Sequence, residues 1–298
     1  MTRAAEMKRM LLSEEIVVVP SAYDGLSARV IQASGFGAIH LTGSGSSACL
    51  LGSPDVGLAT VAEMATHAKN VVQAVDVPVI ADADTGYGNA INVIRTIREY
   101  EHAGLVGCHL EDQVTPKRCG HLDGKQLISA AEMREKIEAA AYARRDPDFM
   151  IIARTDARNE LGIDEAVRRA NLYREAGADC IFVESPQSVE ELREVRSRVD
   201  GPLLANMVEG GRTPWLTSAE LQDLGYAIVI YPLTAWMGAA AVVRELMRTL
   251  RETGTTQGFW ERSGIGMSFE DLFSVLGYED FLEQERRFVP KPALAGER

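Results

Sequence analysis

The sequence predicts a single (β/α)₈ barrel, and three features of the chain lead to that prediction. Eight short, mostly apolar segments alternate with amphipathic segments in one unbroken series. Several amphipathic segments end at Ala-Gly or Ser-Gly, where glycine tolerates the left-handed conformation that closes a helix. A doubly wound open sheet is the main alternative, but it usually has fewer strands in a chain this long, and no GxGxxG motif follows the first strand.

The expected strands are short and mostly apolar, as strands buried on both faces of a parallel sheet are. They cover residues 17–22, 38–43, 78–84, 107–112, 150–156, 180–185, 202–207 and 227–232. The expected helices cover residues 24–33, 61–74, 90–103, 130–145, 164–176, 189–199, 218–224 and 235–252. Each helix follows one strand, which is the order of a barrel built from strand–helix units.

The composition excludes several classes of protein. Hydrophobic residues make up 46% of the 298 residues and charged residues 25%, the balance of a globular protein with a sizeable core. The net charge of −12 argues against binding to nucleic acid or to an anionic membrane surface. No apolar run reaches the roughly 18 residues that span a bilayer, and the first residues lack the pattern of a signal peptide. The four cysteines lie far apart, so we expect free thiols and a cytoplasmic protein.

No linker divides the chain, and we therefore expect one domain over residues 1–298. Residues from about 253 to 298 exceed what the barrel needs. Apolar and aromatic residues recur in this segment, and we expect a helical extension that packs against another subunit.

Polar residues gather where the expected strands end, and in a barrel the carboxyl ends of the strands form the active site. Asp82 and Asp84 share one face of their strand, and Glu111 ends the next strand. Three converging carboxylates repel one another, and a divalent cation relieves that repulsion. Oxygen ligands without nearby histidine or cysteine favour Mg²⁺ or Mn²⁺. A network of these carboxylates with Arg154, without a metal, is the alternative.

The segment 112–128 is long for a strand–helix connection and carries Lys117, Arg118, Cys119 and His121 close together. Glycines within it supply hinge points. We interpret it as a lid that closes over the acidic site on an anionic substrate. The neighbouring cations predict a lowered pKa for the Cys119 thiol.

Four motifs together resemble the isocitrate lyase / phosphoenolpyruvate mutase superfamily. They are DADTGYGNA at residues 82–90, EDQVTPKRCGH at 111–121, IIARTDA at 151–157 and LLANMVEGGRTP at 203–214. The likeness runs over nearly the whole chain. It implies a (β/α)₈ barrel with Mg²⁺, assembled as a homotetramer of two dimers that exchange a helix after the barrel.

The resemblance also implies a role for each site residue. Asp84 would bind Mg²⁺ directly, with Asp82 and Glu111 holding it through waters, and Cys119 would be the acid–base residue. Arg154 and Glu184 would complete the catalytic pocket. The substrate-binding residues would be Thr42, Gly43, Ser44, Asp55, Lys117, Gly120, His121 and Asn206.

The motifs leave open which activity of the superfamily, lyase or phosphorylmutase, this chain has. The KRCGH loop resembles 2-methylisocitrate and 2,3-dimethylmalate lyases, but carboxyvinyl-carboxyphosphonate phosphorylmutases carry it too. The stretches TGSGSSA, YPLTAWM and GMSFEDLF resemble those phosphorylmutases and the dimethylmalate lyases. His40 stands where 2-methylisocitrate lyase has tyrosine, and Met237 where it has an arginine that holds a tricarboxylate.

We therefore expect a Mg²⁺-dependent lyase that cleaves a substituted malate to a pyruvate-type 2-oxo acid and a carboxylic acid. A phosphonomutase acting on carboxyphosphonoenolpyruvate is the alternative, and an oxaloacetate decarboxylase or a non-catalytic dicarboxylate-binding barrel ranks behind both. The sequence leaves open the natural substrate and the general base that removes the substrate proton.

Overall fold

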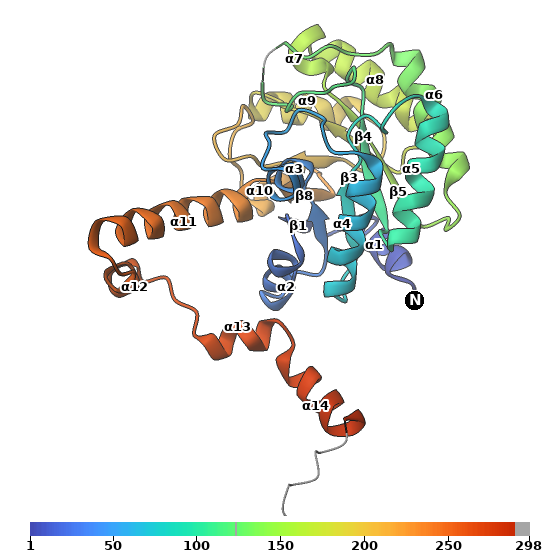
Figure 1. The fold of residues 1–298 in the computed structure, drawn as a ribbon. Coiled ribbons are helices and arrows are strands. Elements are labelled where there is room, and N and C mark those ends of the chain that lie inside the picture. Colours follow the sequence, from blue (N-terminus) through green and yellow to red (C-terminus); the bar gives the residue numbers. More distant parts are fainter. Residues whose placement is uncertain (123, 290–298) are drawn as a thin grey trace, which may run out of the picture. The chain divides into compact units, whose positions relative to one another are not determined.

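The computed structural model describes residues 1–122 and 124–289, and it confirms the predicted (β/α)₈ barrel. The parallel strands are β1 (Val17–Ala22), β2 (Ile39–Leu41), β3 (Val79–Asp82), β4 (Gly107–Glu111), β5 (Met150–Thr155), β6 (Cys180–Val183), β7 (Leu204–Asn206) and β8 (Ile228–Tyr231). They pair in the order β6-β5-β4-β3-β2-β1-β8-β7, and a parallel bridge between Ile181 and Leu203 links the two ends. Figure 1 shows the strands surrounded by helices.

Every helix expected within the barrel is present, with bounds that differ by a few residues. These helices are α2 (Gly25–Ala33), α4 (Val61–Ala74), α5 (Ala90–Ala103), α6 (Ala130–Ala143), α8 (Ile163–Glu175), α9 (Val189–Arg198), α10 (Ser218–Asp223) and α11 (Thr234–Thr253). Capping boxes at Asp24, Thr60 and Thr217 fix where α2, α4 and α10 begin, because these side chains accept the first free backbone N–H groups.

The structure adds three helices that the sequence pattern did not predict: α1 (Arg3–Leu11), α3 (Gly43–Leu51) and α7 (Ala157–Leu161). The second strand covers Ile39–Leu41, so the expectation that it extends to residue 43 is wrong. Thr42 caps α3 by accepting from the backbone N–H of Gly45, and this turns the chain into a helix.

The hydrophobic core has two parts. The interior of the barrel holds residues from alternate strand positions, such as Val19, Ile80 and Ile152, and Met7 and Leu11 of α1 pack with them. A larger cluster fills the space between the strands and the outer helices. Polar side chains at the carboxyl ends of the strands therefore rest on rigid, fully packed elements.

The chain divides into two compact units, residues 1–240 and 241–298, and each is described by itself. The second unit comprises the rest of α11, then α12 (Gln257–Ser263), α13 (Phe269–Val275) and α14 (Tyr278–Phe288). Residues 290–298 of the expected extension lie outside the described residues, and its being part of one domain stays a prediction. None of the helices within the described ranges is long and apolar enough to cross a membrane.

Candidate active site

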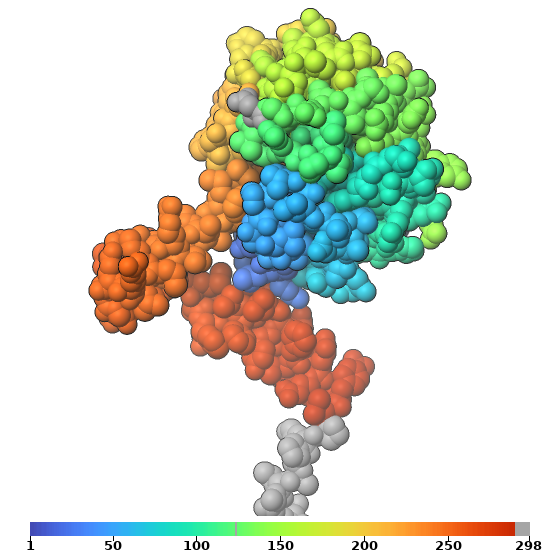
Figure 2. Space-filling model, turned by 45° about the horizontal axis from the view of Figure 1, so that its top comes forward, coloured from blue at the N-terminus to red at the C-terminus, as the bar shows by residue number. Residues whose placement is uncertain are grey.

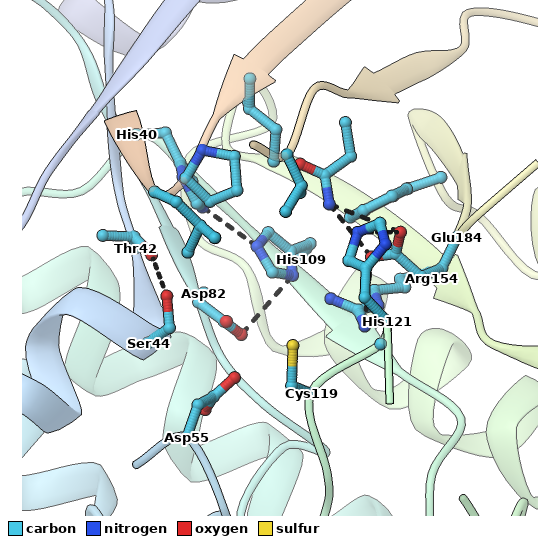
Figure 3. Close-up of a pocket in the computed structure, with 17 residues that line it drawn as sticks. His40, Thr42, Ser44, Asp55, Asp82, His109, Cys119, His121, Arg154 and Glu184 are labelled. Carbon is cyan, nitrogen blue, oxygen red and sulfur yellow. Dashed lines mark hydrogen bonds and ion pairs between the residues drawn. The ribbon is translucent and has the colours of Figure 1, made fainter. Parts of the chain in front are cut away.

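The carboxyl ends of the strands enclose a cavity of about 50 Å³ (Figure 3). It is lined by residues from seven strands, β2 to β8, or the segments after them, together with the loop that follows β4. The lining residues are His40, Thr42, Ser44, Asp55, Asp82, His109, Cys119, Gly120, His121, Arg154, Phe182, Glu184, Asn206, Val208, Ile230, Pro232 and Leu233. Ten of the site residues predicted from the sequence are in this set, and Lys117, Asp84, Glu111 and Gly43 contact its members.

Asp82 and Asp84 are brought together at the end of β3. The backbone N–H of Asp84 donates to Oδ1 of Asp82 at 2.8 Å. Asp84 has φ of 45°, a left-handed conformation that is uncommon outside glycine, asparagine and aspartate. Burial raises the pKa of Asp84 to about 6, and the nearby carboxylates of Asp82 and Asp55 add to the rise.

Lys117 reaches from the loop after β4 into this carboxylate group. Its Nζ lies 2.5 Å from Oδ1 of Asp55 and 3.0 Å from Oδ1 of Asp84. Although burial by itself lowers the pKa of Lys117, these carboxylates raise it well above its usual range. Lys117 is therefore a buried, permanently charged ammonium group that binds two of the predicted site residues to the loop.

Arg154 is the second buried cation of the site. Its Nε lies 2.9 Å from Asp156 and 3.3 Å from Glu111, and its Nη2 lies 3.2 Å from Glu184. The guanidinium also stacks over the ring of Phe182, with 5.1 Å to the centroid. Three carboxylates and the ring of Phe182 fix the orientation of the Arg154 guanidinium, because this group is planar and rigid.

The loop that follows β4 lies over the cavity. Gly120 approaches Arg154 and Glu184 so closely that a Cβ there would lie 2.3 Å from Nη2 of Arg154. His121 places Nε2 3.3 Å from Oε1 of Glu184, and Lys125 contacts Asp156 at 3.3 Å. In Figure 2 this loop lies beside the segment that follows β2, which agrees with the close approach of Gly57 to Lys117.

Cys119 points into the cavity between Asp55 and His121 (Figure 3). The prediction of a lowered pKa for its thiol is wrong: burial raises the pKa of Cys119, and the carboxylates of Asp55 and Glu184 add to the rise. The cations next to it in the sequence do not offset this, because Lys117 is paired with carboxylates. The thiol therefore keeps its proton at neutral pH.

The remaining predicted residues frame the cavity. The hydroxyl groups of Thr42 and Ser44 lie 3.0 Å apart at the start of α3. Asn206 donates through Nδ2 to Glu184 at 3.1 Å. Its Oδ1 is buried and has no hydrogen-bond partner among the described residues, so it is available to a bound molecule.

The predicted metal ligands fit a divalent cation by their chemistry. Both carboxylate oxygens of Glu111 are buried without a hydrogen-bond partner within residues 1–122 and 124–289, and burial raises the pKa of Glu111 well above its usual range. In the same described residues, no three acidic, histidine or cysteine side chains are grouped as a ready metal site. Mg²⁺ commonly keeps most of its waters and needs only one or two carboxylates, so this arrangement is compatible with it.

The sequence analysis missed His109 and several apolar lining residues, and it singled out His40 without giving it a role. His109 and His40 line the cavity, as do Phe182, Ile230 and Leu233. The alternation of strand residues was the available signal, because His109 lies two residues before Glu111 and Phe182 lies two before Glu184.

Relatives of this chain include lyases and phosphomutases, and the chain is an enzyme of that class. The profile of the phosphoenolpyruvate phosphomutase family matches residues 7–251, so the chain belongs to this family. The resemblance seen in the four sequence motifs is thereby confirmed.

Three relatives show the range of activities in the family. The chain is 49% identical over 289 residues to 2,3-dimethylmalate lyase of Eubacterium barkeri, covering 97% of this chain and 99% of the relative. It is 44% identical to 2-methylisocitrate lyase of Aeropyrum pernix, covering 94% and 89%. It is 43% identical to the chloroplastic carboxyvinyl-carboxyphosphonate phosphorylmutase of Arabidopsis thaliana, covering 94% and 83%.

Solved structures agree with this assignment. A crystal structure of 2,3-dimethylmalate lyase superposes with a TM-score of 0.90 at 38% identity, covering 100% of this chain and 99% of that one. A phosphonopyruvate hydrolase solved with oxalate and Mg²⁺ superposes with a TM-score of 0.86 at 31% identity, covering 97% and 100%.

Proposed function

We propose that the protein is a metal-dependent carbon–carbon lyase that cleaves an alkyl-substituted malate to a pyruvate-type 2-oxo acid and a carboxylic acid. The observation that carries this proposal is the Cys119 thiol, which lines one cavity together with carboxylates such as Asp55 and Asp82 and with apolar side chains. The 49% identity to 2,3-dimethylmalate lyase supports the same reaction.

The cavity suits a dicarboxylate that carries alkyl groups. Val208, Ile230 and Leu233 form an apolar wall that favours methyl groups, because their burial is favourable. Arg154 and the hydroxyl groups of Thr42 and Ser44 face the same space and suit a carboxylate.

In this mechanism a general base of the site accepts the proton of the 2-hydroxyl. The bond between C2 and C3 then breaks, and C2 becomes the carbonyl of the 2-oxo acid. The electron pair of the broken bond remains on the other fragment, which is an enolate-like carboxylate. Cys119 donates its proton to that fragment and completes the carboxylic acid. The raised pKa suits this role, since the thiol holds a proton to give.

Asp82, Asp84 and Glu111 would hold a divalent cation, and Mg²⁺ is the ion that their oxygen ligands favour. Such an ion would supply Lewis-acid stabilisation of the negative charge that the 2-hydroxyl oxygen acquires when it loses its proton. The Mg²⁺ and oxalate in phosphonopyruvate hydrolase support this part of the proposal.

The test is a screen of the purified protein with Mg²⁺ against 2,3-dimethylmalate, 2-methylisocitrate, oxaloacetate and phosphonopyruvate, with products identified by NMR. We expect cleavage of 2,3-dimethylmalate to pyruvate and propionate. Turnover of none of the malates, with turnover of a phosphonate, would refute the lyase assignment.

A phosphonomutase acting on carboxyphosphonoenolpyruvate is the second candidate. The 43% identity to a carboxyvinyl-carboxyphosphonate phosphorylmutase favours it, because that similarity extends over 284 residues. The two candidates differ in the bond formed, so ³¹P NMR distinguishes a new carbon–phosphorus bond from carbon–carbon cleavage.

We also propose a cytoplasmic homotetramer built from helix-swapped dimers. The second unit supports the assembly, because Phe269, Phe281 and Phe288 are 74%, 62% and 70% exposed in the single chain. The four cysteines are free, in keeping with a reducing compartment. Light scattering of the purified protein tests the assembly, and a monomer would contradict it.

A further inference from the structure

Four buried polar side chains form a continuous series beside the cavity. Oγ of Ser21 lies 2.8 Å from Nδ1 of His40, and Nε2 of His40 lies 3.0 Å from Nε2 of His109. Nδ1 of His109 then lies 3.5 Å from Oδ1 of Asp82 (Figure 3). None of the four is more than 6% exposed, and the proposed reaction gives no role to Ser21, His40 or His109.

The barrel topology brings these residues together from four strands. Ser21 in β1 is in register with His40 in β2, and Asp82 in β3 is in register with His109 in β4. The rings of His40 and His109 stack with centroids 5.2 Å apart. Rigid strands therefore hold every donor and acceptor of the series in place.

The direction of each hydrogen bond follows from the contact between the two rings. One of the two facing Nε2 atoms must carry a proton and donate the hydrogen bond, and the other must be unprotonated and accept it. If His109 were the donor, its unprotonated Nδ1 would face the carboxylate of Asp82, and two acceptors would oppose each other. If His40 is the donor, the Ser21 hydroxyl donates to His40, His40 donates to His109, and the Nδ1–H of His109 faces Asp82.

The second arrangement leaves no acceptor facing an acceptor. One proton on each ring satisfies all three contacts of the series: Ser21 with His40 at 2.8 Å, His40 with His109 at 3.0 Å, and His109 with Asp82 at 3.5 Å. With one proton per ring, the direction of the whole series is fixed by its two ends, a hydroxyl that can donate and a carboxylate that accepts.

We propose that Ser21 and His40 are positioning residues that hold His109 as its Nδ1–H tautomer and direct that N–H at the carboxylate of Asp82. His109 and the backbone N–H of Asp84 both approach Oδ1 of Asp82, while Oδ2 lies against Gly43. The series of hydrogen-bonding side chains therefore orients the Asp82 carboxylate of the active site. The expected effect on kcat rests on the proposed function, whereas the tautomer of His109 can be measured without it.

The direct test is ¹⁵N NMR of sedimented protein labelled only in its five histidines, because the ring nitrogens report the tautomer. His67 contacts the carbonyl of Tyr23 through Nε2 at 2.8 Å, and Nδ1 of His121 accepts from the backbone of Arg212 at 3.1 Å, so both should carry their proton on Nε2. His109 is the buried histidine that we expect to be protonated on Nδ1, with the signal assigned by its loss in His109→Gln. A neutral His109 protonated on Nε2 would overturn the inference.

Variants of His40 test the positioning role. In His40→Gln the side-chain amide can donate to His109 and accept from Ser21, so we expect an Nδ1–H tautomer at His109 and kcat within about threefold of the parent. His40→Leu removes both hydrogen bonds. We expect mixed tautomers at His109 and a kcat lower by about 10–100-fold, the usual effect of losing a residue that orients a ligand side chain.

Ser21→Ala removes the first donor of the series, and we expect kcat to fall about three- to tenfold, the worth of one neutral hydrogen bond. Ser46→Ala is the matched control, since Ser46 is equally buried and its hydroxyl has no partner within the described ranges. A folded His40→Leu enzyme with parent kcat and an unchanged His109 spectrum would overturn the proposal. If the protein cleaves no malate at all, the proposed function fails while the spectrum still decides the tautomer.

Discussion

Replacement of Gly43 by alanine tests the geometry of the site most directly. A Cβ at Gly43 would lie 2.3 Å from Oδ2, 2.8 Å from Cγ and 3.1 Å from Cβ of Asp82. An ordinary contact begins near 3.4 Å, so the carboxylate must retreat by about 1 Å. The hydrogen bond from the Asp84 backbone opposes this movement at 2.8 Å. Because a displacement of about 1 Å in an active site costs on the order of 100-fold, we expect that loss in kcat/KM.

The assay is steady-state release of the 2-oxo acid from the malate that the substrate screen identifies, with thermal unfolding measured alongside. Gly25→Ala is the matched control, because Gly25 is also the first residue of its helix and its nearest neighbour is 3.6 Å away, at the Cβ of Ala74. Gly25→Ala should keep the parent kcat/KM. Parent activity in a folded Gly43→Ala enzyme would show that the position of Asp82 does not matter for the reaction.

Three further predictions concern the thiol, the metal and the substrate. Cys119→Ser should lower kcat by about 10²–10⁴-fold, the usual worth of general acid catalysis. Since the pKa of the thiol is raised above its ordinary value of 9.0, the parent kcat should stay level through neutral pH and fall only above that value; a fall near pH 7 would contradict the acid role. EDTA should abolish activity and Mg²⁺ or Mn²⁺ should restore it, with Asp84→Ala more damaging than Asp82→Ala; full activity in chelator would remove the metal from the proposal. kcat/KM should be at least about 10²-fold poorer for 2-methylisocitrate than for 2,3-dimethylmalate, because a third carboxylate would be buried without a cation; efficient 2-methylisocitrate cleavage would show that Met237 does not mark a dicarboxylate site.

The barrel was predictable because its signal is repeated along the chain. Each strand is a short apolar run followed by an amphipathic helix, and one misjudged boundary does not change the series. The helix α3 was missed because GSGSSACLL has small residues and no amphipathic pattern. Its formation depends on the cap at Thr42 and on packing against Asp82, which are contacts that periodicity does not report.

The site was predictable where strand ends place residues and less so where a loop places them. Asp82 and Glu111 lie at the barrel mouth as the strand pattern indicates. The pKa of Cys119 was predicted from its neighbours in the sequence, but the neighbours in space decide it. Lys117, two residues away, directs its ammonium group to Asp55 and Asp84, and burial then dominates at the thiol.

The ion pairs of the site connect the position of the loop after β4 to the carboxylates of the proposed active site. Lys117 supplies the cation for Asp55 and Asp84, so the loop is held in place by carboxylates that the reaction also needs. Arg154 faces the space that a substrate carboxylate would enter, but its charge is already balanced by Glu111, Asp156 and Glu184. A dianionic malate adds two more negative charges to a cavity that already holds more carboxylates than cations. A divalent cation would offset this excess of negative charge, and this is the physical reason that the proposed function includes a metal ion.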